Sequence, residues 1–422
     1  VLVVIVRCET RSRLNVDLKP SPGEFLHARW DDSDASFPFW LFWNTEFHAF
    51  TCRVDPPSGR YIFRHLKEAF RCHAQRICGP SDGPQKKPPN LTHHLTYGLN
   101  AIGGFEDVNI VASGRRKIAV IGAGNVGATC AFVLAQMKVA DVVLLDIYEG
   151  FAKGKALDMS QNANVLNYDG TITGTADYND IAGSDVVVVT SGFPRQPGMT
   201  REDLIGKNAD IVSQVGAGIK EHAPEAVVIV VTNPLDLMTY HMQKVTGFPP
   251  ERVIGQAGVL DSARMAHFIA LELDCAEEDV SPMVLGGHGD TMVPLPRYTT
   301  VGGIPITQLM SDERIQAISA RTAGGGGEIV KLLERGSAFY APGSAAAVMA
   351  ESVLNDRRRL IPASCLLTGQ YGLSDVYIGV PCIVGAGGVT RIFELDLSEE
   401  ELTSLQGSGE FYKGQLRDVL GY

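Results

Sequence analysis

The chain has 422 residues, of which 45% are hydrophobic and 20% are charged, so it is long enough for two or three globular domains. Its net charge of −11 argues against nucleic acid or an anionic membrane surface as the main partner, but not against small anionic substrates. No apolar run approaches the roughly 20 residues of a membrane-spanning helix, and eight cysteines are too few for a disulfide scaffold, so we expect a cytoplasmic location.

Residues 1–113 differ in composition from the rest of the chain. They hold all three tryptophans, six of the ten histidines and four of the eight cysteines. The segment lacks sustained helical or strand periodicity and contains turn-forming stretches at 55–59 and 79–84. We expect a poorly ordered N-terminal extension that the chemistry does not need. A small independent module is the alternative, because the aromatic content is high for disorder.

Targeting and metal binding are weak interpretations of this segment. The apolar start at 1–6 has no basic segment before it, and scattered acidic residues disfavour a transit peptide. Cys72 and Cys78 lie near His65 and His73, but a C-x5-C spacing fits no common zinc pattern. We therefore expect no metal site.

The stretch 117–146 has the order strand, glycine turn, helix, strand, acid. Gly122, Gly124 and Gly127 form G-x-G-x-x-G between a buried strand at 118–121 and a helix that extends to about Met137. The first glycine permits a tight turn, the second lets the backbone approach a pyrophosphate, and the third allows close helix–strand contact. This order predicts a dinucleotide-binding site.

Asp146 ends the second strand, 142–145, about 20 residues after the turn. A carboxylate there can accept both ribose hydroxyls and would repel a 2′-phosphate, so NAD is favoured over NADP.

Strand-like and helix-like runs alternate from Arg115 on, which predicts an α/β parallel sheet. Further buried strands are expected at 186–190 and 227–231, with a helix over 204–219 between them. The Pro- and Gly-rich loop 191–201 leaves the carboxyl end of a strand, where ligands bind in open α/β sheets.

The pattern changes after about Gly255. Helices are expected at 259–273, 312–335 and 345–354, strands at 280–285, 292–296 and 376–380, and an amphipathic segment from Ser398. Four glycines at 324–327 predict a break or hinge in the second of these helices. The predicted organisation is an extension (1–113), a Rossmann-type doubly wound NAD-binding domain (114–257) and a mixed α+β catalytic domain (258–422).

Four further positions could carry chemistry. His288 stands between glycines after a strand, which leaves its imidazole accessible, and its ordinary pKa suits proton transfer, although an isolated histidine is more often structural. Asp261 and Arg264 begin a helix, where they could be a cap and a surface cation.

The other two positions are a strand end and a loop. Residues 231–233 end a strand beside a proline, and Asn-Pro turns are common. Arg195 and Arg201 lie on the loop 191–201; such cations are usually solvated, but this loop could also form an anion lid.

Taken together, these motifs resemble those of the lactate/malate dehydrogenase family, specifically its lactate-dehydrogenase-like malate dehydrogenases. The matching motifs are GAGNVG, LLD, RQPGMTR, GKNADIV, VTNPLD, VLDSAR, GGHGDTMVPL and GVPCIVGAGGV. They spread over residues 115–422, whereas residues 1–113 resemble nothing in that family.

The resemblance implies where NAD binds. The pyrophosphate lies on the glycine turn, the adenosine ribose lies at Asp146, and the nicotinamide half lies along Asn208 and residues 231–233. The implied cofactor-binding residues are Gly122, Ala123, Gly124, Asn125, Val126, Gly127, Asp146, Asn208, Val231, Thr232 and Asn233.

It also implies roles for the four candidate positions. His288 exchanges a proton with the hydroxy acid, and Asp261 accepts the other ring N–H. Arg264 binds the C1 carboxylate of the substrate, and Arg201 polarises the reacting carbonyl. Asn233 hydrogen-bonds the substrate oxygen or carboxylate.

Arg195 decides the substrate in this resemblance, because that position is usually glutamine in lactate enzymes and arginine in malate enzymes. The second carboxylate of oxaloacetate needs a bidentate partner in a closed site. We therefore expect reversible NAD-dependent oxidation of (S)-malate by a homodimer or homotetramer. The rivals are a lactate or other 2-hydroxyacid dehydrogenase, and a non-catalytic NAD-binding protein.

Overall fold

The computed structural model describes residues 25–29, 38–44, 49–53, 115–193 and 199–422. The chain forms two units, Val1–Asn109 and Ile110–Tyr422. In the first unit, β1 (Phe25–Arg29), β2 (Pro38–Asn44) and β3 (Ala49–Arg53) form an antiparallel sheet in that order. The sequence pattern did not predict these strands. The Cys72/Cys78 group and most of the predicted extension lie outside the described residues.

The second unit is built on one large sheet, and its parallel half has the order β6-β5-β4-β7-β8-β9. These strands are β4 (Lys117–Ile121), β5 (Asp141–Leu145), β6 (Ile172–Thr175), β7 (Val186–Val189), β8 (Val227–Val230) and β9 (Val253–Gly255). The order reverses between β4 and β7, as in a doubly wound Rossmann sheet. This confirms the predicted fold class, and the predicted strands 118–121, 142–145, 186–190 and 227–231 are confirmed.

The sheet continues antiparallel beyond β9. Its further strands are β11 (Val284–Gly286), β12 (Met292–Pro294), β15 (Arg359–Thr368), β16 (Ser374–Gly385) and β17 (Gly388–Ile392). A separate small sheet contains β10 (Val280–Ser281), β13 (Thr300–Val301) and β14 (Ile304–Pro305). The expected strand 280–285 is thus two short strands in different sheets.

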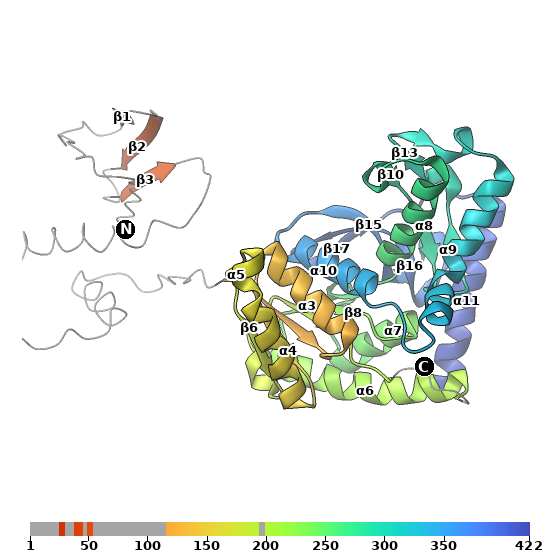
Figure 1. The fold of residues 1–422 in the computed structure, drawn as a ribbon, viewed down its shortest axis with the longest axis horizontal. Coiled ribbons are helices and arrows are strands. Elements are labelled where there is room, and N and C mark those ends of the chain that lie inside the picture. Colours follow the sequence, from red (N-terminus) through yellow and green to blue (C-terminus); the bar gives the residue numbers. More distant parts are fainter. Residues whose placement is uncertain (1–24, 30–37, 45–48, 54–114, 194–198) are drawn as a thin grey trace, which may run out of the picture. The chain divides into compact units, whose positions relative to one another are not determined.

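Helices cover the sheet (Figure 1). They are α3 (Asn125–Met137), α4 (Glu149–Gln161), α5 (Ala163–Leu166), α6 (Arg201–His222), α7 (Leu235–Thr246), α8 (Gly258–Leu273), α9 (Asp312–Leu333), α10 (Tyr340–Leu354) and α11 (Glu399–Leu420). Short 3-10 turns span Tyr178–Ile181, Pro250–Arg252, Glu277–Asp279, Pro296–Tyr298, Ile306–Gln308 and Gln370–Gly372.

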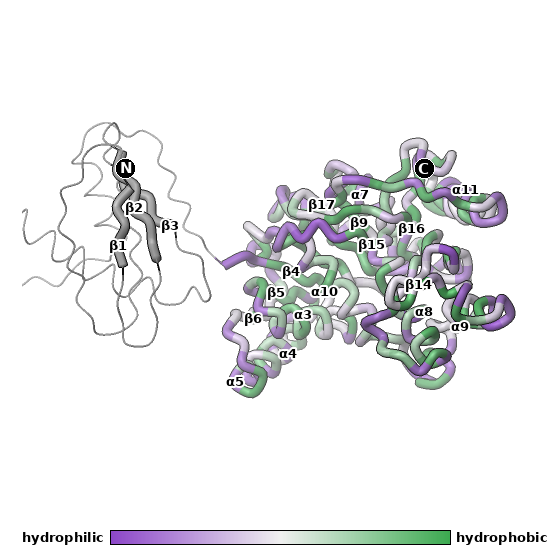
Figure 2. Tube along the Cα trace, turned by 90° about the horizontal axis from the view of Figure 1, so that it is seen from above, coloured by the Kyte–Doolittle hydropathy of each residue, from purple (hydrophilic) through white to green (hydrophobic). Residues whose placement is uncertain are grey.

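The core lies along the parallel strands: β4 and β5 are mostly hydrophobic (Figure 2), and so are β7 and β8. All four valines of β7 are fully buried, as expected of a strand covered on both faces. Because the strands are short and held on both sides, their carboxyl ends form a rigid edge on which side chains and turns can be placed.

The predicted break at residues 324–327 is wrong, because α9 is one continuous helix. A Cβ on Gly325 would lie 3.2 Å from Cδ of Arg264, and one on Gly326 would lie 3.6 Å from a guanidinium nitrogen of the same residue. Glycine costs a helix interior about 1 kcal/mol relative to alanine. Gly325 therefore makes room for Arg264, whereas a methyl group on Gly326 would be in ordinary contact with it. Nothing in the structure explains Gly324 and Gly327.

Candidate active site

The glycine turn follows β4 at the point where the strand order reverses. Gly122 has φ +104°, a conformation that favours glycine, and its N–H donates to the carbonyl of Leu145 at 2.7 Å. A Cβ on Gly127 would lie only 1.8 Å from the carbonyl oxygen of Gly122. Both glycines are therefore required by the fold itself.

Gly124 has the opposite environment. It is exposed, its φ of −59° suits any residue, and a Cβ there would meet no atom within 4 Å. It caps α3 without a side-chain hydrogen bond, so the first N–H groups of that helix face outward beside Asn125 and Val126. This open helix N-terminus fits a pyrophosphate.

Asp146 closes the turn from the next strand. One carboxylate oxygen accepts the N–H of Ala123 at 2.7 Å, and the other accepts the N–H of Tyr148 at 3.0 Å. These bonds fix the carboxylate beside the turn, where a ribose attached to the pyrophosphate would lie. The residues present therefore fit the dinucleotide predicted from the sequence.

Asn208 ties together the ends of β7 and β8. Its Oδ1 accepts the N–H of Phe193 at 2.6 Å, and its Nδ2 donates to the carbonyl of Asn233 at 2.6 Å. Thr232 donates to the carbonyl of Ser191 at 2.6 Å. These buried contacts hold Val231–Asn233 beside the loop that leaves β7, and the Asn233 side chain stays exposed.

His288, Asp261 and Arg264 form one cluster. The Nδ1 of His288 lies 3.0 Å from Oδ2 of Asp261, whose other oxygen lies 3.4 Å from a guanidinium nitrogen of Arg264. Their side chains are 15%, 3% and 14% exposed. Asp261 is thus not a helix cap, because α8 is capped at Ala257, and Arg264 is not a surface cation.

The pKa of His288 is raised above its ordinary value by this surrounding charge. Burial lowers the pKa, but the attraction and hydrogen bond of Asp261, together with the charge of Asp236, outweigh that effect and the opposing charge of Arg264. The site therefore favours the imidazolium, while its bond to Asp261 leaves Nε2 as the free ring nitrogen.

Three residues that we did not single out from the sequence hold the backbone around His288. Its N–H donates to Oδ2 of Asp236 at 2.9 Å, its carbonyl accepts from Oη of Tyr412 at 3.4 Å, and the N–H of Gly287 donates to Oγ of Ser408 at 3.0 Å.

Gly287 is required by packing rather than by substrate access. A Cβ there would lie 2.0 Å from the Tyr412 ring. The flanking glycines were interpreted as leaving the imidazole open; at Gly287 the glycine instead makes room for α11. Asp236 stands in the VTNPLD motif and could have been found there, whereas Tyr412 and Ser408 have no local signal.

Arg201 begins α6, directly after a capping box in which Thr200 and Asp203 exchange hydrogen bonds. Its guanidinium lies over the ring of Phe411 at 4.8 Å, next to Tyr412 in α11. The side chain of Arg201 is exposed. Burial raises the pKa of the Tyr412 hydroxyl, and the positive charge of Arg201 opposes that rise. Arg195 lies outside the described residues, so its position stays a prediction.

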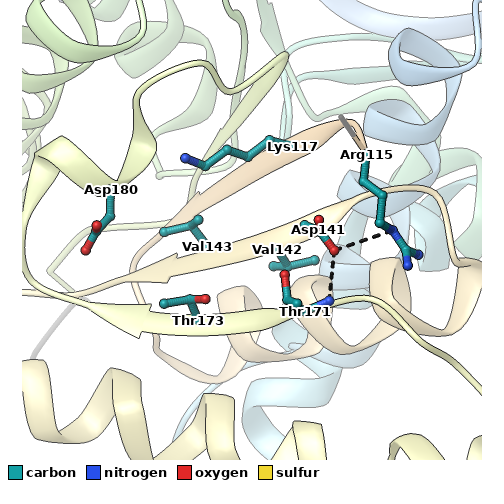
Figure 3. A pocket seen from close by; sticks show the side chains of 8 residues that line it. All are labelled: Arg115, Lys117, Asp141, Val142, Val143, Thr171, Thr173 and Asp180. Carbon is teal, nitrogen blue, oxygen red and sulfur yellow. Dashed lines mark hydrogen bonds and ion pairs between the residues drawn. The ribbon is translucent and has the colours of Figure 1, made fainter. Parts of the chain in front are cut away.

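A hollow lies at the opposite, amino ends of β4, β5 and β6 (Figure 3). Arg115 and Asp141 form an ion pair of 3.5 Å there, and Asp141 also accepts the N–H of Thr171. These polar groups already contact one another, and the hollow is remote along the strands from the glycine turn. We assign it no function.

Comparisons with known proteins agree with this geometry. Residues 116–255 match the family profile described as lactate/malate dehydrogenase, NAD binding domain, and residues 258–420 match the lactate/malate dehydrogenase alpha/beta C-terminal domain. A malate dehydrogenase of Roseiflexus sp. (strain RS-1) is 54% identical over 296 residues, which cover 70% of this chain and 96% of that protein. The chain belongs to the lactate/malate dehydrogenase family.

Solved structures of both kinds of family member are similar to this chain. A malate dehydrogenase from Salinibacter ruber is 49% identical with a TM-score of 0.69, covering 72% of this chain and 97% of the other. A Cryptosporidium parvum lactate dehydrogenase, solved with lactic acid and nicotinamide adenine dinucleotide, is 41% identical with a TM-score of 0.71, covering 73% and 99%. The cofactor of this lactate/malate dehydrogenase family member is NAD.

Two negative findings apply only to the residues that the structure describes. No group of His, Cys, Asp and Glu side chains there is arranged to hold a metal ion. None of the described helices combines the length and apolar character that a membrane crossing needs.

Proposed function

We propose that this chain is a malate dehydrogenase that catalyses the reversible NAD-dependent oxidation of (S)-malate to oxaloacetate. The observation that carries the proposal is the buried cluster in which Asp261 lies 3.0 Å from His288 Nδ1 and also contacts Arg264. A binding protein would have no use for a histidine whose pKa is raised by a buried carboxylate beside an NAD site.

In the proposed mechanism the substrate's C1 carboxylate binds the guanidinium of Arg264. Asp261 accepts the Nδ1 proton of His288, so Nε2 carries the lone pair that takes the hydroxyl proton during oxidation and returns it during reduction. Arg201 polarises the reacting C–O bond, and Asn233 hydrogen-bonds the substrate. NAD supplies the hydride acceptor, while the residues of the chain supply orientation and charge.

The proposed cofactor contacts follow the geometry of the turn. The helix N-terminus at Gly124–Gly127 holds the pyrophosphate, Asp146 holds the adenosine ribose, and Asn208 with Val231–Asn233 borders the nicotinamide half. The open surface at Gly124 and the fixed carboxylate of Asp146 support this assignment.

The choice of malate over lactate is supported by Arg195 and by the comparisons, since the malate dehydrogenase named above is 54% identical and the lactate dehydrogenase 41%. Steady-state kinetics with NADH and either oxaloacetate or pyruvate test the proposal. We expect kcat/KM to favour oxaloacetate; a preference for pyruvate would assign the chain to the lactate branch, and no turnover of either would leave only NAD binding.

Replacing Gly124 with alanine is expected to weaken NAD binding without harming the fold. The new methyl group meets no protein atom, but it stands where the backbone must approach the pyrophosphate. We expect the Kd for NAD, measured by calorimetry, to rise at least about tenfold, with an unchanged melting temperature.

The matched control is Gly127→Ala, whose methyl group would lie 1.8 Å from a backbone oxygen. That variant should lose thermal stability. If Gly124→Ala binds NAD normally, the pyrophosphate does not lie on this turn.

We also propose that the chain assembles as a homodimer or homotetramer. Support comes from exposed apolar side chains on α4 and α5, among them Phe151, Leu157 and Val165, of which Leu157 is 61% exposed. Light scattering coupled to size exclusion should give a mass of two or four times 45.4 kDa; a monomer mass would contradict the proposal.

The remaining assignments complete the proposed function. We place the division between the NAD-binding and catalytic domains at residues 257/258, and residues 1–113 outside both.

We infer a cytoplasmic location and a role in the tricarboxylic acid cycle. The free thiols of Cys130, Cys275, Cys365 and Cys382 suit a reducing compartment. Cell fractionation tests the location.

A further inference from the structure

Asp236 is a buried carboxylate without a role in the mechanism above. It lies in the first turn of α7, it is 1% exposed, and it accepts two hydrogen bonds. Its Oδ2 accepts the backbone N–H of His288 at 2.9 Å, and its Oδ1 accepts the hydroxyl of Ser364 in β15 at 2.7 Å. A backbone N–H can only donate, so the oxygen that faces His288 serves as an acceptor.

Burial, together with the charge of Asp261, raises the pKa of Asp236, and the two hydrogen bonds and the charge of His288 offset only part of that rise. The N-terminus of α7 adds a partial positive charge beside the carboxylate. Asp236 is buried and bonded to the backbone of His288, so its negative charge acts on the imidazole of that residue.

The charges that face His288 come from three elements. Asp261 and Arg264 lie on α8, Asp236 lies on α7, and Tyr412 lies on α11, with Arg201 beyond it. With both carboxyl groups ionised and the imidazole neutral, the two carboxylates and Arg264 sum to one negative charge. Proton uptake by His288 makes the cluster neutral, whereas without Asp236 the same uptake would leave a buried positive charge.

We propose that Asp236 is a positioning residue for His288: it fixes the backbone at His288 and supplies the negative charge that favours the protonated imidazole. The inference rests on the proposed function, in which His288 exchanges the proton. It adds a residue that touches neither substrate nor cofactor and acts only through His288.

The variant Asp236→Asn tests the charge with little change of shape. Its amide oxygen can still accept the N–H of His288, and its amide nitrogen can donate to Ser364. At saturating cofactor, the acid limb of the kcat/KM profile for malate and the alkaline limb for oxaloacetate should both move to lower pH, by about one unit. KM for NAD should stay unchanged.

The comparison variant is Ser364→Ala, which removes a hydrogen bond that lowers the pKa of Asp236 but leaves the carboxyl group in place. Its pH limbs should move in the same direction as those of Asp236→Asn, and by less. A shift of the Ser364→Ala limbs to higher pH, or no shift in Asp236→Asn, would mean that the charge of Asp236 has no role. Should Asp236→Asn fail to fold, Asp236→Ser takes its place, with the same expected shift.

A direct titration separates this inference from the proposed function. In protein labelled with ¹³C-histidine, the His288 signal is assigned by its loss in His288→Gln and followed by NMR against pH. A lower imidazole pKa in Asp236→Asn supports the inference even if malate is not turned over. Normal turnover with an unmoved imidazole pKa would overturn the inference and leave the proposed function intact.

Discussion

Replacing His288 with asparagine is expected to lower kcat/KM for malate oxidation by about 10³- to 10⁴-fold, the upper range of general acid–base catalysis. Asparagine can still donate its amide N–H to Asp261, so the carboxylate keeps a partner, but it cannot take the hydroxyl proton. Since the reaction is reversible, oxaloacetate reduction should fall by the same factor. Initial rates in both directions at saturating cofactor measure the effect.

The matched control is His267→Asn in α8. That imidazole pairs with Glu277 at 2.7 Å but is 50% exposed, so its loss should leave both rates unchanged. NAD binding by the His288→Asn variant should equal that of the wild type, because no NAD contact is assigned to His288. Near-normal turnover by His288→Asn would end the proposed mechanism.

The parallel half of the fold was accessible from sequence because its signals are local. Four consecutive valines at 186–189 predict a buried strand, and the G-x-G-x-x-G pattern predicts a tight turn, each from a few adjacent residues. The clash distances at Gly122 and Gly127 confirm that these glycines are needed for the turn and for helix–strand contact. The neighbouring pairs β4–β5 and β7–β8 are consecutive parallel strands, each joined through a helix as the βαβ rule expects.

The surroundings of His288 were less accessible, since they come from distant parts of the chain. Asp236 contacts His288 from 52 residues away, and Ser408 contacts Gly287 from 121 residues away. No periodicity or motif spacing encodes such contacts. The same limit explains the wrong prediction for α9, where the glycine run looked like a break until Arg264 of α8 was seen to lie against it.

The helix α11 connects two parts of the site that the sequence separates widely. Phe411 lies under the guanidinium of Arg201, and Tyr412, the next residue, hydrogen-bonds the carbonyl of His288. Arg201 and His288 therefore contact adjacent residues of α11. The residue proposed to polarise the substrate carbonyl and the residue proposed to exchange its proton are therefore both anchored to α11.

Arg195→Gln is expected to move substrate preference from oxaloacetate towards pyruvate. Oxaloacetate carries a second carboxylate, which in a closed site needs a cationic partner, and arginine offers two parallel donors. Without that partner the buried carboxylate costs several kcal/mol, which corresponds to a change on the order of 10³-fold in the ratio of the two kcat/KM values. For pyruvate the same replacement removes an unpaired cation, so its kcat/KM should rise.

The control for charge alone is Arg314→Gln, which removes an exposed arginine paired with Glu272 at the surface. It should leave the ratio of kcat/KM values unchanged, because surface ion pairs contribute little and Arg314 has no part in the proposed site. The pH profile should also separate the two effects: Arg195→Gln changes which substrate is accepted but leaves the limbs set by His288 in place. A variant that still prefers oxaloacetate as strongly as the wild type would remove Arg195 from the specificity argument, and recognition of the second carboxylate would have to come from another cation.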